Sequence, residues 1–208
     1  MPRKVSDVNA GSMADIAFLL LIFFLVTTTI ETDSGINRKL PPMDQLDDPP
    51  EIKERNIFEV VVNKYNQLLV EENLTELGDL RGLAIEFLDN GAGEAEEACD
   101  YCQGSRDPSS SVNPDRAVIS LKNDRETSYK VYIAVQNELV GAYNDLRNRE
   151  FKRLFPQEGL SYVEAQNTYD DPRTDLDIRE ELKPKLDQVK KMFPQKLSEA
   201  EPSKANRN

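Results

Sequence analysis

The sequence of 208 residues contains no histidine and no tryptophan, and it has only two cysteines. Histidine is the commonest general base near neutral pH and the commonest metal ligand, so its absence removes the usual proton relay and most metal sites. The sequence also has no glycine-rich phosphate loop, no G-x-S-x-G elbow and no metal-protease motif. We therefore expect a protein that is not an enzyme and that binds no metal or cofactor.

Positive charge is also scarce, because 26 Lys and Arg residues face 38 Asp and Glu residues, for a formal net charge of −12. A strongly acidic protein repels nucleic acids and anionic membrane surfaces, so we expect no nucleic-acid partner. The acidic residues are scattered along the chain, which is typical of a solvated surface.

Long apolar runs are limited to one stretch, residues 13–30, within which every residue from 16 to 26 is apolar. As an α-helix this stretch spans roughly 27 Å, close to the hydrocarbon core of about 30 Å in a bilayer. We predict a single transmembrane helix here, after a cytoplasmic lead of residues 1–12 that carries Arg3 and Lys4. A cleaved signal peptide is the alternative, but residues 27–31 offer no small-x-small cleavage site.

A single carboxylate, Asp15, lies about one helical turn inside this run. An ionised Asp at the centre of a span costs about 2.5–3.5 kcal/mol, and less near an end. Two interpretations stay open: a helix-end residue that reaches the headgroups, or a carboxyl buried against helices of other chains that takes up and releases a proton. On a helix this carboxyl shares one stripe, the candidate channel-facing side, with Phe18, Leu19, Ile22 and Val26.

The remainder of the chain predicts one small α/β domain. Residues 31–56 contain four prolines and predict an extended linker, either a passive spacer or, around residues 36–40, a strand that pairs with another copy. Residues 57–200 predict a two-layer domain in which helices cover one face of a sheet. It would carry insertions near 91–115 and 156–193, and a disordered tail at 201–208.

Periodicity assigns the elements of this domain. Strands are expected at 57–62, 67–71, 116–121 and 196–200, and helices at 73–91, 129–155 and 176–193, with Pro184 as a candidate break in the last. The strand at 116–121 is apolar nearly throughout, which predicts burial on both faces.

The two cysteines, Cys99 and Cys102, form a C-D-Y-C motif in the first insertion. Structural zinc needs four ligands, and thioredoxin-like pairs open a helix directly after a strand, so neither pattern fits. The favoured interpretation is a disulfide in an exposed loop, in an oxidising compartment, with little effect on folding. A catalytic redox pair and two unpaired thiols are the alternatives.

The N-terminal residues resemble a known family. The stretch NAGSMADI at residues 9–16, followed by an apolar run that closes at Val26-Thr27, is similar to the signature of the ExbD/TolR family, whose acid falls on Asp15. The family's usual Thr-Pro before this acid is Gly11-Ser12 here. Residues 36–41, 57–88 and 118–146 resemble the family's linker and its strand and helix segments more weakly.

This resemblance implies a stator subunit of a proton-driven complex in the inner membrane, with its main domain in the periplasm and Asp15 as the proton-conducting residue. It implies two copies of this chain inside a pentameric ring of an ExbB/TolQ-like membrane subunit, and motion delivered to a TonB- or TolA-like protein. TonB-dependent outer-membrane transport is the favoured system, and a Tol-type envelope-maintenance or gliding/secretion motor is the alternative. The residues also allow a membrane-tethered binding module that binds the cell wall or a partner without conducting protons.

Overall fold

The computed structural model describes residues 10–27 and 52–200 of the chain. The chain divides into two units, Met1–Pro49 and Pro50–Asn208, which are described separately. The predicted strand at 36–40, most of the predicted linker and the predicted tail lie outside the described residues.

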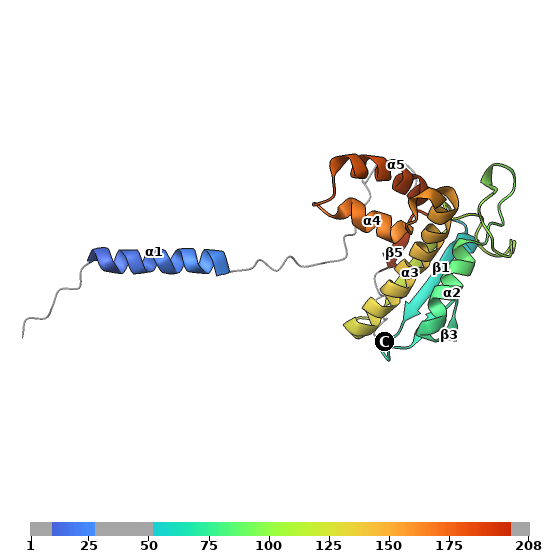
Figure 1. Cartoon of the computed structure of the whole chain (residues 1–208). Helices are drawn as coiled ribbons and strands as arrows, with labels where there is room; N and C mark the ends of the chain where they lie inside the picture. The colour runs from blue at the N-terminus through green and yellow to red at the C-terminus, as the bar shows by residue number, and fades with distance from the viewer. Residues whose placement is uncertain (1–9, 28–51, 201–208) are drawn as a thin grey trace, which may run out of the picture. The chain divides into compact units, whose positions relative to one another are not determined.

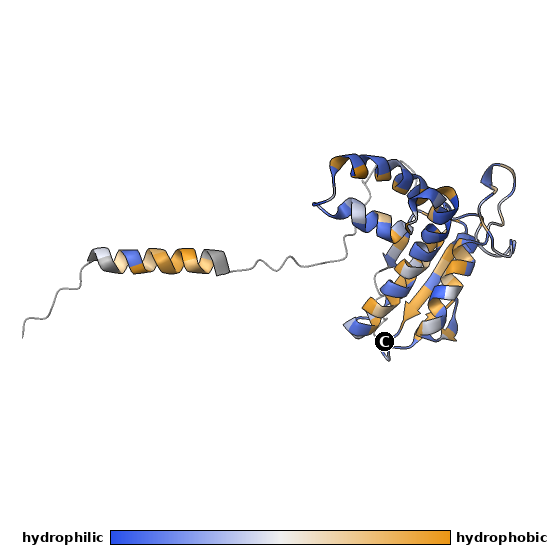
Figure 2. Ribbon diagram, viewed as in Figure 1, coloured by the Kyte–Doolittle hydropathy of each residue, from blue (hydrophilic) through white to orange (hydrophobic). Residues whose placement is uncertain are grey.

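The described element of the first unit is α1, Ala10–Thr27. Its run of Leu, Ile, Phe and Ala residues favours a helix, and Figure 2 shows it as hydrophobic along most of its length. Taken over the described residues alone, no helix combines the length and the apolar character that crossing a membrane requires. The span predicted for residues 13–30 ends outside the described residues and stays a prediction.

The second unit is built on a mixed sheet, which within residues 52–200 has five strands in the order β3-β2-β1-β4-β5. The first three strands form an antiparallel meander, whereas β4 lies parallel to both β1 and β5. Figure 1 labels β1, β3 and β5 of this sheet. Parallel neighbours need crossover connections, and helices supply them here. The strands are β1 Ile57–Val62, β2 Leu68–Val70, β3 Asn73–Thr75, β4 Val118–Asn123 and β5 Leu197–Ala200.

Only one face of the sheet is fully buried. In β1 the residues alternate between half-buried and buried, as its β-branched sequence IFEVVV favours for a half-covered strand. In β4, Ile119 and Leu121 are buried while Val118 and Ser120 are half-buried. The prediction that this strand is buried on both faces is therefore wrong, because the described helices pack against one face.

Two helices form the second layer, α2 (Leu77–Leu88) and α3 (Tyr129–Leu154). Their buried residues meet the sheet in one core, where the rings of Phe58 and Phe87 stack with centroids 5.1 Å apart. This arrangement confirms the predicted α/β fold class. The helix expected over 73–91 is shorter than predicted, because its first residues pair with β2 as strand β3.

The second insertion contains more helix than the one predicted at 176–193. Residues 156–174, where no helix or strand was expected, contain a 3-10 turn, Pro156–Glu158, and helix α4, Tyr162–Asp170. The following helix α5, Leu176–Met192, continues through Pro184, so the candidate break is absent from this described segment. An internal proline costs about 3 kcal/mol. Apolar side chains of α5 that are buried against α3 and α4 offset that cost. They are Leu182, Leu186 and Val189.

Candidate functional site

The predicted proton-conducting residue, Asp15, lies on α1. The helix places it on one face with Phe18, Leu19 and Ile22, and Val26 follows one turn further along. The large apolar side chains described on α1 are between 42% and 63% exposed, on this face and on the opposite one alike. The described large apolar side chains of α1 are therefore exposed on every face of the helix.

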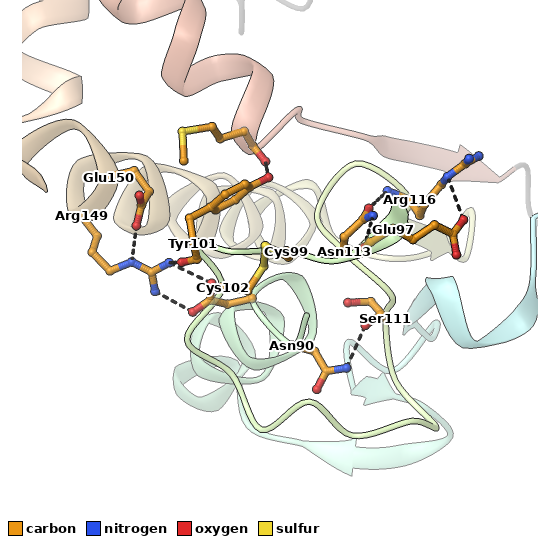
Figure 3. Close-up of a disulfide and its surroundings, with 12 residues drawn as sticks. Asn90, Glu97, Cys99, Tyr101, Cys102, Ser111, Asn113, Arg116, Arg149 and Glu150 are labelled. Carbon is orange, nitrogen blue, oxygen red and sulfur yellow. Dashed lines mark hydrogen bonds and ion pairs between the residues drawn. A yellow bond between two sulfur atoms is a disulfide. The ribbon is translucent and has the colours of Figure 1, made fainter. Parts of the chain in front are cut away.

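The two cysteines form a disulfide that closes a short loop between α2 and β4 (Figure 3). Most residues of the loop at 94–109 are exposed, as expected, but the two cysteines themselves are buried, with Cys99 5% and Cys102 7% exposed. The loop packs against Gly91, whose φ of 68° favours glycine, and a Cβ atom there would lie 2.6 Å from the Cβ of Cys102. The disulfide thus belongs to the folded core of the domain.

Asn90 organises the first insertion around the end of α2. Its side-chain amide donates to the carbonyls of Asp107 and Ser111 at 2.9 and 2.8 Å, and its Oδ1 accepts the N–H of Asp107 at 2.8 Å. A buried amide with its hydrogen bonds satisfied fixes the path of the backbone. The segment predicted as an exposed insertion is therefore anchored to the core.

A charged network joins Asp89, at the end of α2, to α3. Arg149 donates to both carboxylate oxygens of Asp89, at 2.5 and 2.8 Å, and to Glu150 at 3.0 Å. The hydrogen bonds to Asp89 are the main reason that the pKa of Arg149 rises above its usual value. Glu150 is fully buried and is also paired with Arg153 at 2.6 Å. These contacts stabilise the domain, and the sequence alone gave no signal for them.

Tyr101, between the two cysteines, ties the insertion to the end of α5. Its hydroxyl donates to the carbonyl of Met192 at 2.8 Å, and its ring meets that of Phe193 edge to face. Burial, with the nearby charges of Asp115, Glu150 and Asp89, raises the pKa of Tyr101 to about 12. The phenol is therefore protonated at neutral pH and acts as a structural hydrogen-bond donor.

A cleft of about 420 Å³ lies beside β2, β3 and α2. The described residues that line it include four carboxylates and one guanidinium, so we call it the acidic cleft. Its walls come from separate segments of the chain, so no local sequence pattern predicts it. The lining residues are Glu54, Arg55, Ile57, Phe58, Val70, Glu71, Asn73, Thr75, Leu83, Glu86, Phe87, Asn90, Ser105, Asp107, Ser109 and Ser110.

The described part of the chain holds no group of three or more His, Cys, Asp or Glu residues placed to bind a metal ion. The features that remain are a lone carboxylate on an apolar helix, a compact α/β domain and the acidic cleft. Together they define a small domain protein with an apolar N-terminal helix.

Comparison with protein families identifies this class more closely. The family described as biopolymer transport protein ExbD/TolR matches residues 1–147, well over half of the chain. The protein therefore belongs to the ExbD/TolR family, as its N-terminal residues predict. A comparison with curated proteins found no match. The family match ends inside α3, so α4, α5 and β5 lie beyond it.

Membership of the family has general consequences. ExbD/TolR proteins are non-enzymatic stator subunits that transduce energy for biopolymer transport, and they are anchored in the inner membrane. They generally work with ExbB/TolQ-like and TonB/TolA-like partners. Membership does not distinguish a Ton system from a Tol system.

Proposed function

We propose that this protein is the proton-conducting stator subunit of an inner-membrane complex that couples the proton motive force to TonB-dependent outer-membrane transport. The observation that carries the proposal is Asp15, a lone carboxylate on a helix whose described apolar side chains are exposed on every face. Ionisable groups within apolar helices mark ion pathways, because an acid there is costly without a function.

In this proposal residues 13–30 span the membrane once and residues 57–200 form a periplasmic domain. Two copies of the span lie inside a pentameric ring of an ExbB/TolQ-like partner, which covers the exposed apolar side chains of α1. The disulfide between Cys99 and Cys102 supports an oxidising compartment for the domain, since such bonds are rare in the cytosol.

Asp15 couples proton flow to movement through its two protonation states. The protonated carboxyl packs against apolar partner helices at little cost, whereas the carboxylate requires water or a polar partner group. The nearest other polar side chains in the predicted span begin at Thr27, roughly 18 Å along the helix axis at about 1.5 Å per residue, so the partner must supply that group. Alternation between the two environments biases the span between two positions.

Chromosomal replacement of Asp15 tests the mechanism. Asp15→Asn keeps size and polarity but carries no proton, so it should abolish proton flux in vesicles that contain the partner subunit, with protein level and complex assembly unchanged. Asp15→Glu should retain part of the flux. Asp177→Asn, a neutralised exposed carboxylate on α5, is the matched control and should conduct normally. Undiminished flux in Asp15→Asn would refute proton conduction and leave the tethered binding module.

The assembly has a separate test, because the native cysteines are already bonded to each other. Ile22→Cys places a single free thiol on the Asp15 face of α1. Cross-linking in native membranes should capture both a second copy of this chain and the ring subunit. Capture of neither would contradict the ring arrangement. Recovery of a TonB-like rather than a TolA-like chain with the complex would identify the energised system.

A further inference from the structure

We propose that the acidic cleft is a binding site for a cationic peptide segment of a partner protein, one that carries a bulky apolar side chain between lysine or arginine residues. The site involves no proton movement and does not include Asp15, so it goes beyond the proposed stator function. The cleft is large enough to hold a ligand, because its volume of about 420 Å³ falls within the roughly 300–1,000 Å³ that is usual for ligand pockets.

The floor of the cleft is apolar. It is formed by the stacked rings of Phe58 and Phe87, with Val70 beside them and Leu83 on the wall formed by α2. Leu83 is 37% exposed, whereas Leu80 and Leu88 on the same helix are completely buried and Leu77 at its start is 39% exposed. Phe58, Phe87 and Val70 are only 4–7% exposed, so an apolar side chain inserted here would mainly cover Leu83, which supplies affinity of about 25 cal/mol per Å² buried.

The rim of the cleft carries uncompensated negative charge. Glu54 and Glu86 are exposed, and within the described residues neither forms an ion pair or a side-chain hydrogen bond. Arg55 is the cation of the rim, and its guanidinium is directed to the carbonyl of Pro108 at 3.1 Å. A cleft lined by one sign of charge attracts ligands of the opposite sign and disfavours others.

Two further carboxylates of the cleft are held in place by the backbone. Glu71 accepts the N–H of Glu59 at 2.7 Å, and Asp107 accepts the N–H and hydroxyl of Ser109 at 2.8 and 2.6 Å. Glu71 and Glu72 form the β2–β3 turn with φ of 48° and 65°, where Asn-Gly would be the unstrained choice. Such strain costs on the order of 1–3 kcal/mol for each residue and concentrates at binding sites. Preorganised acids reduce the cost of binding a cation.

This combination of floor and rim selects the ligand class. The negative rim repels nucleic acids and anionic lipids, and the described residues there form no metal-binding cluster. A simple cation would leave the apolar floor unused, and a purely apolar ligand would leave the carboxylates unused. A peptide with alternating cationic and apolar side chains uses both.

The test uses the full-length protein in neutral maltoside micelles and a fluorescein-labelled peptide, Lys-Leu-Lys-Phe-Lys-Leu, with binding read by fluorescence anisotropy. The expected result is saturable binding that weakens as salt rises from low to high concentration. The peptides Glu-Leu-Glu-Phe-Glu-Leu and Lys-Ser-Lys-Ser-Lys-Ser should not bind, since each lacks one of the two required features. Equal binding of the acidic peptide would refute the proposal.

Variants locate the binding at the cleft. The double variant Glu54→Gln/Glu86→Gln should weaken binding by about five- to thirty-fold, as expected when two rim charges each contribute up to about 1 kcal/mol. Both side chains are exposed, so the fold should persist, and circular dichroism checks this. The control Asp177→Asn/Glu180→Gln removes the same charge from α5 and should bind within about two-fold of the wild type. Equal affinity of the two double variants would overturn the proposal.

Discussion

Replacing Arg149 by methionine should destabilise the domain strongly, because the arginine neutralises two buried carboxylates. The side chain of Asp89 is 6% exposed and that of Glu150 is 0% exposed, and both bind this guanidinium. Removing one partner of a buried ion pair costs about 3–5 kcal/mol. Glu150 keeps its contact with Arg153, so we expect the lower end, about 3 kcal/mol. For a chain of this size that corresponds to a fall of about 6–12 °C in Tm.

The matched control is Arg173→Met, which breaks an exposed pair. The Arg173 side chain is 89% exposed and lies 3.1 Å from Asp171. Exposed pairs contribute about 0–1 kcal/mol, so this variant should be close to the wild type. The two substitutions remove the same group and differ in the burial of the carboxylate left behind.

Urea unfolding of the full-length protein, followed by circular dichroism, measures both effects. The double variant Asp89→Asn/Arg149→Met provides a further check, because it removes the carboxylate together with its cation. It should recover more than half of the loss caused by Arg149→Met. A loss below about 1 kcal/mol for Arg149→Met, equal to that of the exposed control, would refute the buried-charge argument.

Three further predictions concern the same domain. Mass measurement after alkylation without reductant should find no labelled thiol, and Cys99→Ala/Cys102→Ala should lower the unfolding free energy by about 2 kcal/mol, as a closed loop of this length predicts. Burial raises the pKa of Tyr143 from 10.0 to about 12, so the unfolded chain loses this proton first. Its contribution is intact below pH 10 and is lost as pH rises towards about 12, by up to about 3 kcal/mol, and Tyr143→Phe should show a shallower loss in alkaline unfolding. Ser161→Ala removes the capping box of α4 and should cost about 1 kcal/mol in urea unfolding, whereas Ser161→Asp should be nearly neutral.

Elements with a strong local pattern were predictable from the sequence. The β-branched run of β1 and the helical spacing in α3 predicted these two elements within a residue of the observed ends. Strand β3 was not predictable, because its three residues have no strand pattern and are held by pairing with β2. Helix α4 was missed because only Tyr162 and Ala165 are buried, so its apolar periodicity is weak and its capping box defines the start.

The candidate sites also differ in whether the sequence alone reveals them. Asp15 is visible in the sequence because one acid interrupts a contiguous apolar run. The acidic cleft is not visible, because its lining runs from Glu54 to Ser110 and converges only when β2, β3 and α2 are folded together. The cysteine pair was visible as a candidate disulfide, but its burial depends on the chain path set by Asn90 and Gly91.

The segment beyond the family match is part of the domain core, and this leads to a last prediction. Phe193 is completely buried in the main cluster although the match ends at residue 147. Its carbonyl accepts hydrogen bonds from buried Arg147 at 2.7 and 3.0 Å. Phe193→Ala should therefore cost about 3–5 kcal/mol in urea unfolding, the range for a buried aromatic side chain.

Leu176→Ala is the control from the same segment, because this side chain is 71% exposed and should change stability by less than about 0.5 kcal/mol. If the residues beyond the family match folded as a separate unit, Phe193→Ala would not shift the main unfolding transition. A second transition, or a loss as small as that of Leu176→Ala, would contradict a shared core. A single transition shifted to lower urea would show that residues beyond the family match complete the folded domain.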